Sequence, residues 1–142
     1  MKIVINNPQE MANLATKIAN EVKTGDIICL KGTLGAGKSF FAKSFINALQ
    51  EKPSEVLSPT FNLLYSYETK KGEIFHFDLY RLKSPDELEN IGFFDALQNG
   101  ICLIEWPEIA AKFLPKNCTE IEIKILGEEK RELMITSPNL SS

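Results

Sequence analysis

Residues 32–39 limit what this chain can fold into more than any other segment. They read GTLGAGKS and match the pattern GxxxxGK(S/T) at every fixed position. The apolar run Asp26–Leu30 precedes them, and a segment whose apolar residues recur at helical spacing follows. Strand, glycine-rich loop and helix in this order are typical of a phosphate-binding loop, so we expect an α/β domain that binds a nucleotide. The alternative is a glycine-rich turn that only connects a strand to a helix.

Each residue type of this loop has a role in phosphate binding. Glycines let the backbone approach the β-phosphate closely, and successive N–H groups point into a concavity at a helix N-terminus. We expect Lys38 to bridge β- and γ-phosphate oxygens and the hydroxyl of Ser39 to be one oxygen ligand of Mg²⁺. The candidate nucleotide-binding residues are Gly32, Thr33, Leu34, Gly35, Ala36, Gly37, Lys38 and Ser39.

Two acidic residues end predicted strands, and a phosphate-binding loop needs such a carboxylate to orient Mg²⁺ and its waters. Glu105 follows the uninterrupted apolar run 101–104, which is typical of a central strand beside the loop strand. Asp78 ends the alternating segment 74–77, which favours a hairpin strand. We assign metal coordination to Ser39 and Glu105, with Asp78 orienting the metal or positioning the attacking water. The sequence leaves open an exchange of roles between the two acids.

The rest of the chain supplies a sheet and its flanking helices. Apolar runs and period-two alternation predict strands at residues 2–5, 26–30, 61–68, 73–78, 101–105, 119–126 and 131–136. Helices are expected after Pro8, after the loop and after Ser84, which forms a capping-box pattern with Glu87. We therefore expect one three-layer P-loop NTPase domain over residues 1–142, with a mixed, partly antiparallel central sheet flanked by helices. Residues 137–142 are a candidate flexible tail.

Composition argues against several classes of function. The chain has 142 residues with 16 Lys plus Arg against 19 Asp plus Glu, and its net charge of −3 argues against an independent nucleic-acid binder. Its longest apolar runs are far too short to span a bilayer, so we expect a cytoplasmic protein without a membrane segment. Its three cysteines are widely spaced and form no CxxC pair, so we expect buried thiols rather than disulfides or a zinc site.

Four sequence blocks follow one another within this short chain: GTLGAGKS at 32–39, SPTFNLLYSY at 58–67, HFDLYRL at 76–82 and LIEWPE at 103–108. In this order and combination they resemble the TsaE family of small bacterial ATPases. The resemblance spans nearly the whole chain and implies a Mg²⁺-dependent ATPase with ATP and Mg²⁺ as cofactors. It also implies that the chain is required to form N6-threonylcarbamoyladenosine at position 37 of tRNAs that read ANN codons. The implied mechanism is ATP binding and hydrolysis on a complex of TsaB and TsaD. Contact with tRNA is then expected only through that complex.

The resemblance also assigns roles to single residues. Thr60 in the second block resembles a catalytic switch residue near the γ-phosphate, and Asp78 in the third block resembles the catalytic acid. The other implied site residues are Lys38 at the ATP phosphates, Ser39 and Glu105 at Mg²⁺, Trp106 as a packing or partner-facing residue of the site, Asn7 near adenine and Arg131 alongside the nucleotide. The family loop usually reads GDLGAGKT, so Thr33 replaces a carboxylate here while Ser39 keeps the metal-binding oxygen.

Two other functions stay open on the residues alone. A small-molecule kinase would use the same loop, but kinases usually surround the transferred group with several arginines, and this chain has only Arg81 and Arg131. A nucleotide-gated binding module with little hydrolysis has the same sequence signals. His76 between two phenylalanines favours a hydrogen-bonded structural histidine, and the neighbours Lys70 and Lys71 favour a solvated hairpin tip.

Overall fold

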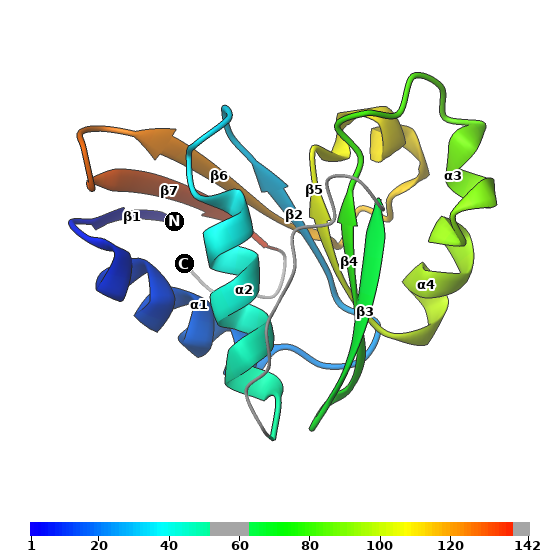
Figure 1. The fold of residues 1–142 in the computed structure, drawn as a ribbon, viewed down its shortest axis with the longest axis horizontal. Coiled ribbons are helices and arrows are strands. Elements are labelled where there is room, and N and C mark those ends of the chain that lie inside the picture. The colour runs from blue at the N-terminus through cyan, green and yellow to red at the C-terminus, as the bar shows by residue number, and fades with distance from the viewer. Residues whose placement is uncertain (52–62, 138–142) are drawn as a thin grey trace.

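The framework of the molecule is one seven-stranded sheet, seen in a computed structural model that describes residues 1–51 and 63–137 (Figure 1). The strands lie in the order β1-β7-β6-β2-β5-β4-β3. Their bounds are β1 Lys2–Ile5, β2 Ile27–Lys31, β3 Leu64–Thr69, β4 Gly72–Asp78, β5 Ile101–Glu105, β6 Thr119–Ile125 and β7 Arg131–Thr136. Strand β2 pairs in parallel with β5 and β6, and β4 pairs in parallel with β5, whereas the remaining pairs are antiparallel. The predicted mixed sheet is confirmed.

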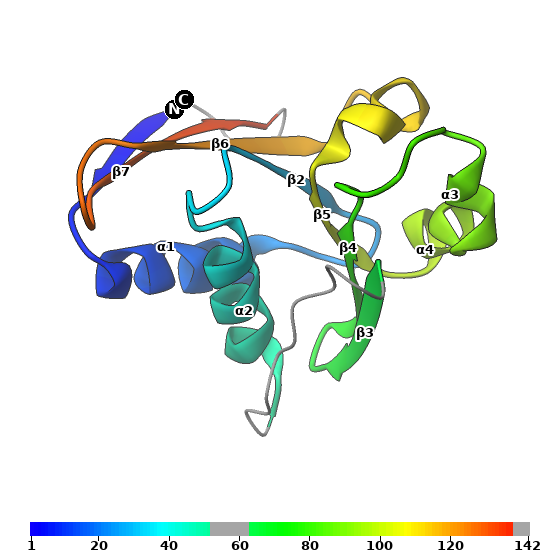
Figure 2. The same ribbon diagram turned by 45° about the horizontal axis from the view of Figure 1, so that its top comes forward.

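Helices cover both faces of this sheet, which gives three layers. Helices α1 (Pro8–Glu21) and α2 (Lys38–Leu49) lie on one side, and α3 (Glu87–Asn90), α4 (Phe93–Asn99) and the 3₁₀ helix η1 (Pro107–Phe113) lie on the other (Figure 2). Strand residues alternate between the two resulting cores: Ile28 and Leu30 pack with α1 and α2, and Ile27 and Cys29 pack with the opposite layer. Within the described ranges, none of the helices is long and apolar enough to cross a membrane.

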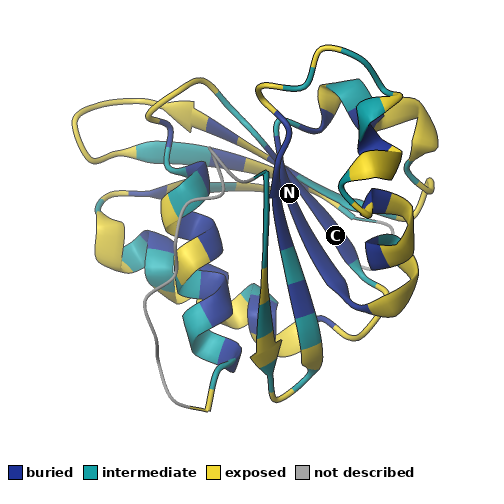
Figure 3. Cartoon of the chain, turned by 45° about the vertical axis from the view of Figure 1, so that its right-hand side comes forward, coloured by how far each residue is buried: buried dark blue, intermediate teal, exposed yellow. Residues whose placement is uncertain are grey.

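The central strands are buried along almost their whole length. All five residues of β5 and the first four of β2 are buried (Figure 3). Their uninterrupted apolar runs follow from this position, because a strand covered on both faces has no solvated side. Strand β7 alternates instead, with Leu133 and Ile135 buried and Met134 exposed. Because β2, β5 and β4 are parallel, their carboxyl ends meet at one edge of the sheet, where such folds bind ligands.

The capping-box contacts predicted for Ser84 and Glu87 form, but the helix does not begin where the pattern predicts it. Helix α3 begins only at Glu87, and the Ser84 hydroxyl accepts a hydrogen bond from the backbone N–H of Asp86 at 3.3 Å. The Glu87 carboxylate accepts from the backbone N–H groups of Lys83 and Ser84 at 2.9 and 3.4 Å. The capping pattern therefore closes the turn before the helix rather than the first turn of the helix.

The prediction of a solvated hairpin tip is wrong for Lys71. Its ammonium donates to three backbone carbonyls at the end of α1, those of Ala19, Asn20 and Val22, at 3.1, 2.8 and 2.6 Å. On the other side of the turn, the backbone N–H of Lys70 donates to the carbonyl of Leu49 at the end of α2 at 3.0 Å. The turn between β3 and β4 is thus fixed between the C-terminal ends of two helices.

The three cysteines differ in their burial. Cys29 and Cys102 lie on central strands and are buried, as expected, whereas Cys118 is half-buried at the rim of the sheet just before β6. All three thiols are free, which agrees with the absence of a disulfide pattern in the sequence. Burial raises the pKa of Cys102 to about 12, and its thiol donates to the carbonyl of Ala96 at 3.4 Å.

Candidate nucleotide-binding site

The glycine-rich loop leaves the carboxyl end of β2 and turns into α2 (Figure 1). Gly32 has a φ of 148°, and a Cβ atom there would lie 2.7 Å from the backbone carbonyl oxygen of Ile123 on β6. Gly37, directly before α2, has a φ of 113°. Only glycine adopts both conformations without strain, so the loop can pass close to β6 and turn sharply into the helix. The first N–H groups of α2 have no partner within the helix, as an anion site requires.

Lys38, the first residue of α2, is held over this loop. Only 5% of the residue is exposed, and its ammonium donates to the backbone carbonyls of Gly32 and Thr33, the latter at 3.2 Å. Its Nζ also lies 3.7 Å from the centre of the Trp106 ring. Burial lowers the pKa of Lys38 below its ordinary value, and the neighbouring carboxylates oppose this shift. The side chain is therefore confined to the region where the loop would hold phosphate oxygens.

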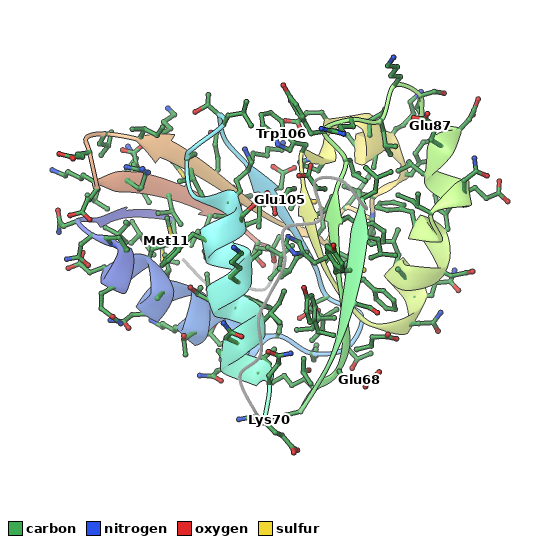
Figure 4. The ribbon with its side chains drawn as sticks, viewed as in Figure 1. Met11, Glu68, Lys70, Glu87, Glu105 and Trp106 are labelled. Atoms are coloured by element: carbon green, nitrogen blue, oxygen red, sulfur yellow. The ribbon has the colours of Figure 1, made fainter. Side chains whose placement is uncertain are left out.

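Two buried carboxylates lie beside the start of α2. Asp78 and Glu105 end β4 and β5, are direct partners across these strands, and are 5% and 2% exposed. The Ser39 hydroxyl donates to Oε1 and Oε2 of Glu105 at 3.0 and 3.1 Å, while Oδ1 of Asp78 accepts from the backbone N–H of Tyr80 at 3.0 Å. Figure 4 shows Glu105 and Trp106 at the end of β5, next to the loop that enters α2. Glu105 is thus the acid in direct contact with Ser39.

These groups line a pocket of about 240 Å³ formed by residues 34–40 with Asp78, Glu105 and Trp106. Its oxygen donors suit Mg²⁺, which prefers oxygen ligands and usually keeps several waters or phosphates. Residues 1–51 and 63–137 contain no cluster of three or more His, Cys, Asp or Glu side chains that could hold a metal ion. The donor set therefore fits an Mg²⁺ that is shared with nucleotide phosphates, and does not fit a metal held by the protein alone.

His76 makes a contact at this site that the sequence pattern did not indicate. The residue is fully buried, and its Nε2 lies 2.7 Å from Oε2 of Glu105. The signal that could have found it is the strand register. Residues 74, 76 and 78 share one face of β4, and Asp78 is the direct partner of Glu105, so His76 lies diagonally across from Glu105 on the same face.

Trp106 has a strained backbone at the exit of β5. Its φ of 56° and ψ of 60° lie in the left-handed region, which bulky residues rarely adopt. This turn places the indole between two side chains: the ring centres of Tyr80 and Trp106 are 4.7 Å apart at 45°, and the Lys38 ammonium lies over the indole. Trp106 is therefore a wall of the loop pocket.

A second hollow of about 240 Å³ lies on the other side of the loop, between the start of α1 and the turn between β6 and β7. It is lined by Ile5, Pro8, Met11, Ala36, Gly37, Phe40, Glu128, Glu129 and Arg131. Arg131 Nε donates to the carbonyl of Ala36 at 2.9 Å, and Nη1 donates to the carbonyls of Gly127 and Lys130 at 2.9 and 3.0 Å. Asn7 is not among the lining residues, and its side chain caps α1 by accepting from Glu10 N–H at 2.9 Å. Arg131 thus braces the loop backbone, and Asn7 organises the neighbouring helix.

A family model described as "Threonylcarbamoyl adenosine biosynthesis protein TsaE" matches residues 5–133. The chain belongs to the TsaE family. Its similarity to TsaE proteins extends over nearly the whole sequence. The membership connects the chain with tRNA threonylcarbamoyladenosine biosynthesis.

Similar TsaE proteins come from several bacteria and are named "tRNA threonylcarbamoyladenosine biosynthesis protein TsaE". The one from Rickettsia felis is 43% identical over 129 residues, covering 91% of this chain and 75% of the relative. The one from Aquifex aeolicus is 43% identical over 136 residues, covering 94% of each chain. The crystal structure of Bacillus subtilis YdiB superposes with a TM-score of 0.75 at 32% identity, covering 96% of this chain and 84% of that one. The fold is therefore shared with a solved structure.

In this TsaE chain, the predicted site residues fall into three groups. Residues 34–39, Asp78, Glu105 and Trp106 line one pocket, and Lys38 reaches back to Gly32 and Thr33 at the loop entrance. Arg131 contacts the loop from the opposite side, and Asn7 lies at the start of α1 without lining either hollow. Thr60 lies outside the described residues, so its role stays a prediction.

Proposed function

We propose that this TsaE-family chain is a Mg²⁺-dependent ATPase of the cytoplasm that acts in tRNA modification by binding and hydrolysing ATP on a complex of TsaB and TsaD. One observation carries the proposal. In the described part of the chain, the buried polar or charged side chains are Lys38, His76, Asp78 and Glu105, and all four lie around the glycine-rich loop. Buried charges are costly unless they serve a paired or functional site, so their concentration here supports nucleotide chemistry.

The residues divide the chemistry of phosphate transfer among them. The N–H groups of the loop and the start of α2 bind the β-phosphate, and Lys38 contacts the β- and γ-phosphates. Ser39 and Glu105 hold Mg²⁺, which when bound offsets the negative charge of the phosphates. Asp78 positions the water that attacks in line, together with the predicted switch residue Thr60. The buried position of both acids keeps their oxygens in a region of low dielectric, where their interactions are strong.

The charge and the pocket of the chain support a dependence on partner proteins, and the family resemblance implies that these are TsaB and TsaD. The net charge is −3, which gives little attraction to the phosphates of tRNA. The pocket at the loop has a volume of about 240 Å³, which suits the phosphate end of a nucleotide rather than a nucleotide and a second substrate. We therefore assign recognition of tRNA to the partner proteins and assign ATP binding to this chain.

The test is to follow ADP and inorganic phosphate from ATP, with Mg²⁺ or with EDTA, in the presence and absence of TsaB and TsaD. We expect Mg²⁺-dependent release of phosphate that rises when both partners are added, and its loss in Lys38→Ala. A phosphorylated small molecule in place of inorganic phosphate would instead identify a kinase. ATP binding without phosphate release, even with both partners, would identify a nucleotide-gated binding module.

A further inference from the structure

His76 forms a buried pair with Glu105, and the proposed chemistry gives the imidazole itself no role. They come from neighbouring parallel strands, β4 and β5, and both side chains are almost completely buried. The 2.7 Å separation between Nε2 and Oε2 is that of a strong hydrogen bond. Ser39, on α2, donates to the same carboxylate from the other side. Glu105 is therefore held between a residue of the loop helix and a residue of β4.

The direction of this hydrogen bond follows from the chemistry of the two groups. An ionised carboxylate only accepts hydrogen bonds, so the proton of the His76–Glu105 contact belongs to Nε2. Oε2 then receives this bond along with the longer contact of 3.1 Å from Ser39, and Oε1 receives the contact of 3.0 Å from Ser39. Nδ1 of His76 has no hydrogen-bond partner among the described residues. Every polar contact of the imidazole in this part of the chain is thus directed at Glu105.

We infer that His76 is a positioning residue that fixes the orientation of the Glu105 carboxylate for the Mg²⁺-bound nucleotide. The inference rests on the proposed function, in which Ser39 and Glu105 hold the metal. When Ser39 turns its oxygen toward Mg²⁺, the hydrogen bond from His76 remains to keep Glu105 in place. Histidine and carboxylate partners that orient metal ligands from outside are common in metal sites, and their loss typically weakens metal binding about 10- to 100-fold.

A purely structural histidine would predict a different pattern of losses. If His76 only filled the space between β4 and α2, its replacement would weaken the fold and nucleotide binding with and without metal alike. If it orients Glu105, nucleotide binding without metal should be nearly unchanged, because the loop backbone and Lys38 make those contacts. The quantity to measure is therefore the ratio of nucleotide affinity in Mg²⁺ to nucleotide affinity in EDTA.

The first experiment measures this ratio by calorimetry with a non-hydrolysable ATP analogue. For His76→Phe we expect the ratio to fall about tenfold or more relative to the wild type, with affinity in EDTA unchanged within about twofold. His76→Gln, which keeps an N–H donor, should recover part of the ratio. Ile74→Val, a buried change on the same face of β4, is the matched control for loss of packing and should leave the ratio unchanged.

Two outcomes would overturn the inference. An unchanged ratio in His76→Phe, or an equal loss in Mg²⁺ and EDTA, would leave only a structural role for the imidazole. A wild-type chain that binds the analogue equally with and without Mg²⁺ would refute the proposed metal site itself, and the inference with it. Thermal unfolding of each variant shows whether the comparison is made between folded proteins, and His76→Gln serves if His76→Phe does not fold.

A second measurement observes the imidazole directly. His76 is the single histidine of the chain, so its ring nitrogens can be assigned without ambiguity in ¹⁵N-detected NMR spectra. We expect a proton on Nε2 in the free protein and in the complex with Mg²⁺ and the analogue, with a shift of the Nε2 resonance between the two. A ring with its proton on Nδ1 and a bare Nε2 would contradict the geometry, since that ring could not donate to Glu105.

Discussion

The ammonium group of Lys71 connects the turn between β3 and β4 to the end of α1, and Lys71→Met removes that group while keeping an unbranched side chain. Its three acceptors, the carbonyls of Ala19, Asn20 and Val22, lie at 3.1, 2.8 and 2.6 Å. A cation at a helix C-terminus contributes about 0.3–1 kcal/mol when exposed and up to about 2 kcal/mol when partly buried. Because Lys71 is half-buried, we expect a loss of about 1–2 kcal/mol in the free energy of unfolding.

This loss should appear as a lower melting temperature. The entropy of unfolding is about 2.1 cal/mol/K per residue, or about 0.3 kcal/mol/K for a chain of 142 residues, so Tm should fall by about 3–7 °C. Thermal unfolding followed by circular dichroism measures the shift. Nucleotide affinity well below Tm should be unchanged, because the turn lies at the opposite end of β4 from Asp78.

Lys70→Met is the matched control for this variant. Lys70 is the exposed neighbour at the tip of the same turn (Figure 4), and its side chain has no hydrogen-bond or ion-pair partner within residues 1–51 and 63–137. Its replacement should change Tm by less than the equivalent of about 0.5 kcal/mol, as is usual for surface substitutions. Equal shifts in the two variants, or a larger shift in Lys70→Met, would refute the assignment of the helix-capping role to Lys71.

Three further predictions concern the loop, its lysine and the thiols. Gly32→Ala should weaken nucleotide binding at least about tenfold, because the new Cβ would lie 2.7 Å from a carbonyl oxygen of β6. In the same titration Gly127→Ala should bind nucleotide normally, because the nearest atom to its Cβ would be 3.7 Å away. Burial lowers the pKa of Lys38, so its ammonium should lose its proton at a lower pH than an ordinary lysine does. ATP affinity measured in EDTA should therefore be highest near neutral pH and fall as the pH rises through this lowered pKa. Lys38→Arg should lack this fall, because arginine keeps its charge. Ellman's reagent should modify Cys118 rapidly and Cys102, whose pKa is about 12, only on unfolding; equal reaction rates would contradict the burial.

The sequence predicted those features of the fold and the site whose pattern lies within a short segment of the chain. The glycine-rich loop is contiguous, and its pattern indicated the strand, the helix and the positions of Lys38 and Ser39 without any tertiary information. The pairing of Asp78 with Glu105 was within reach, because both acids end predicted strands that meet at one edge. Fold and loop were therefore predictable from local signals and strand ends.

Contacts that depend on strand register and side-chain reach were not predictable in the same way. His76 touches Glu105 across 29 positions of sequence, and Arg131 touches Ala36 across 95. Both contacts require the packing of separate segments, and neither leaves a pattern in its own neighbourhood. The same holds for Lys71, whose acceptors lie about fifty residues earlier, at the end of α1. Local propensity describes elements, whereas these contacts are properties of how the elements are arranged.

The burial of charged groups at the site gives a physical reason to expect that the proposed metal and nucleotide depend on each other. Lys38, Asp78 and Glu105 are all buried, and bringing further charge into such a site is costly unless that charge is paired. Phosphates alone would bring more negative charge toward the two acids, and Mg²⁺ alone would lack most of its oxygen ligands. When both bind, Mg²⁺ would offset the charge of the phosphates, and the phosphates would complete the oxygen ligands of Mg²⁺. Each would then raise the affinity for the other, and this mutual effect is a coupling free energy between the two sites. Under the proposed function, we therefore expect the chain to respond to the Mg²⁺ complex of ATP rather than to either component.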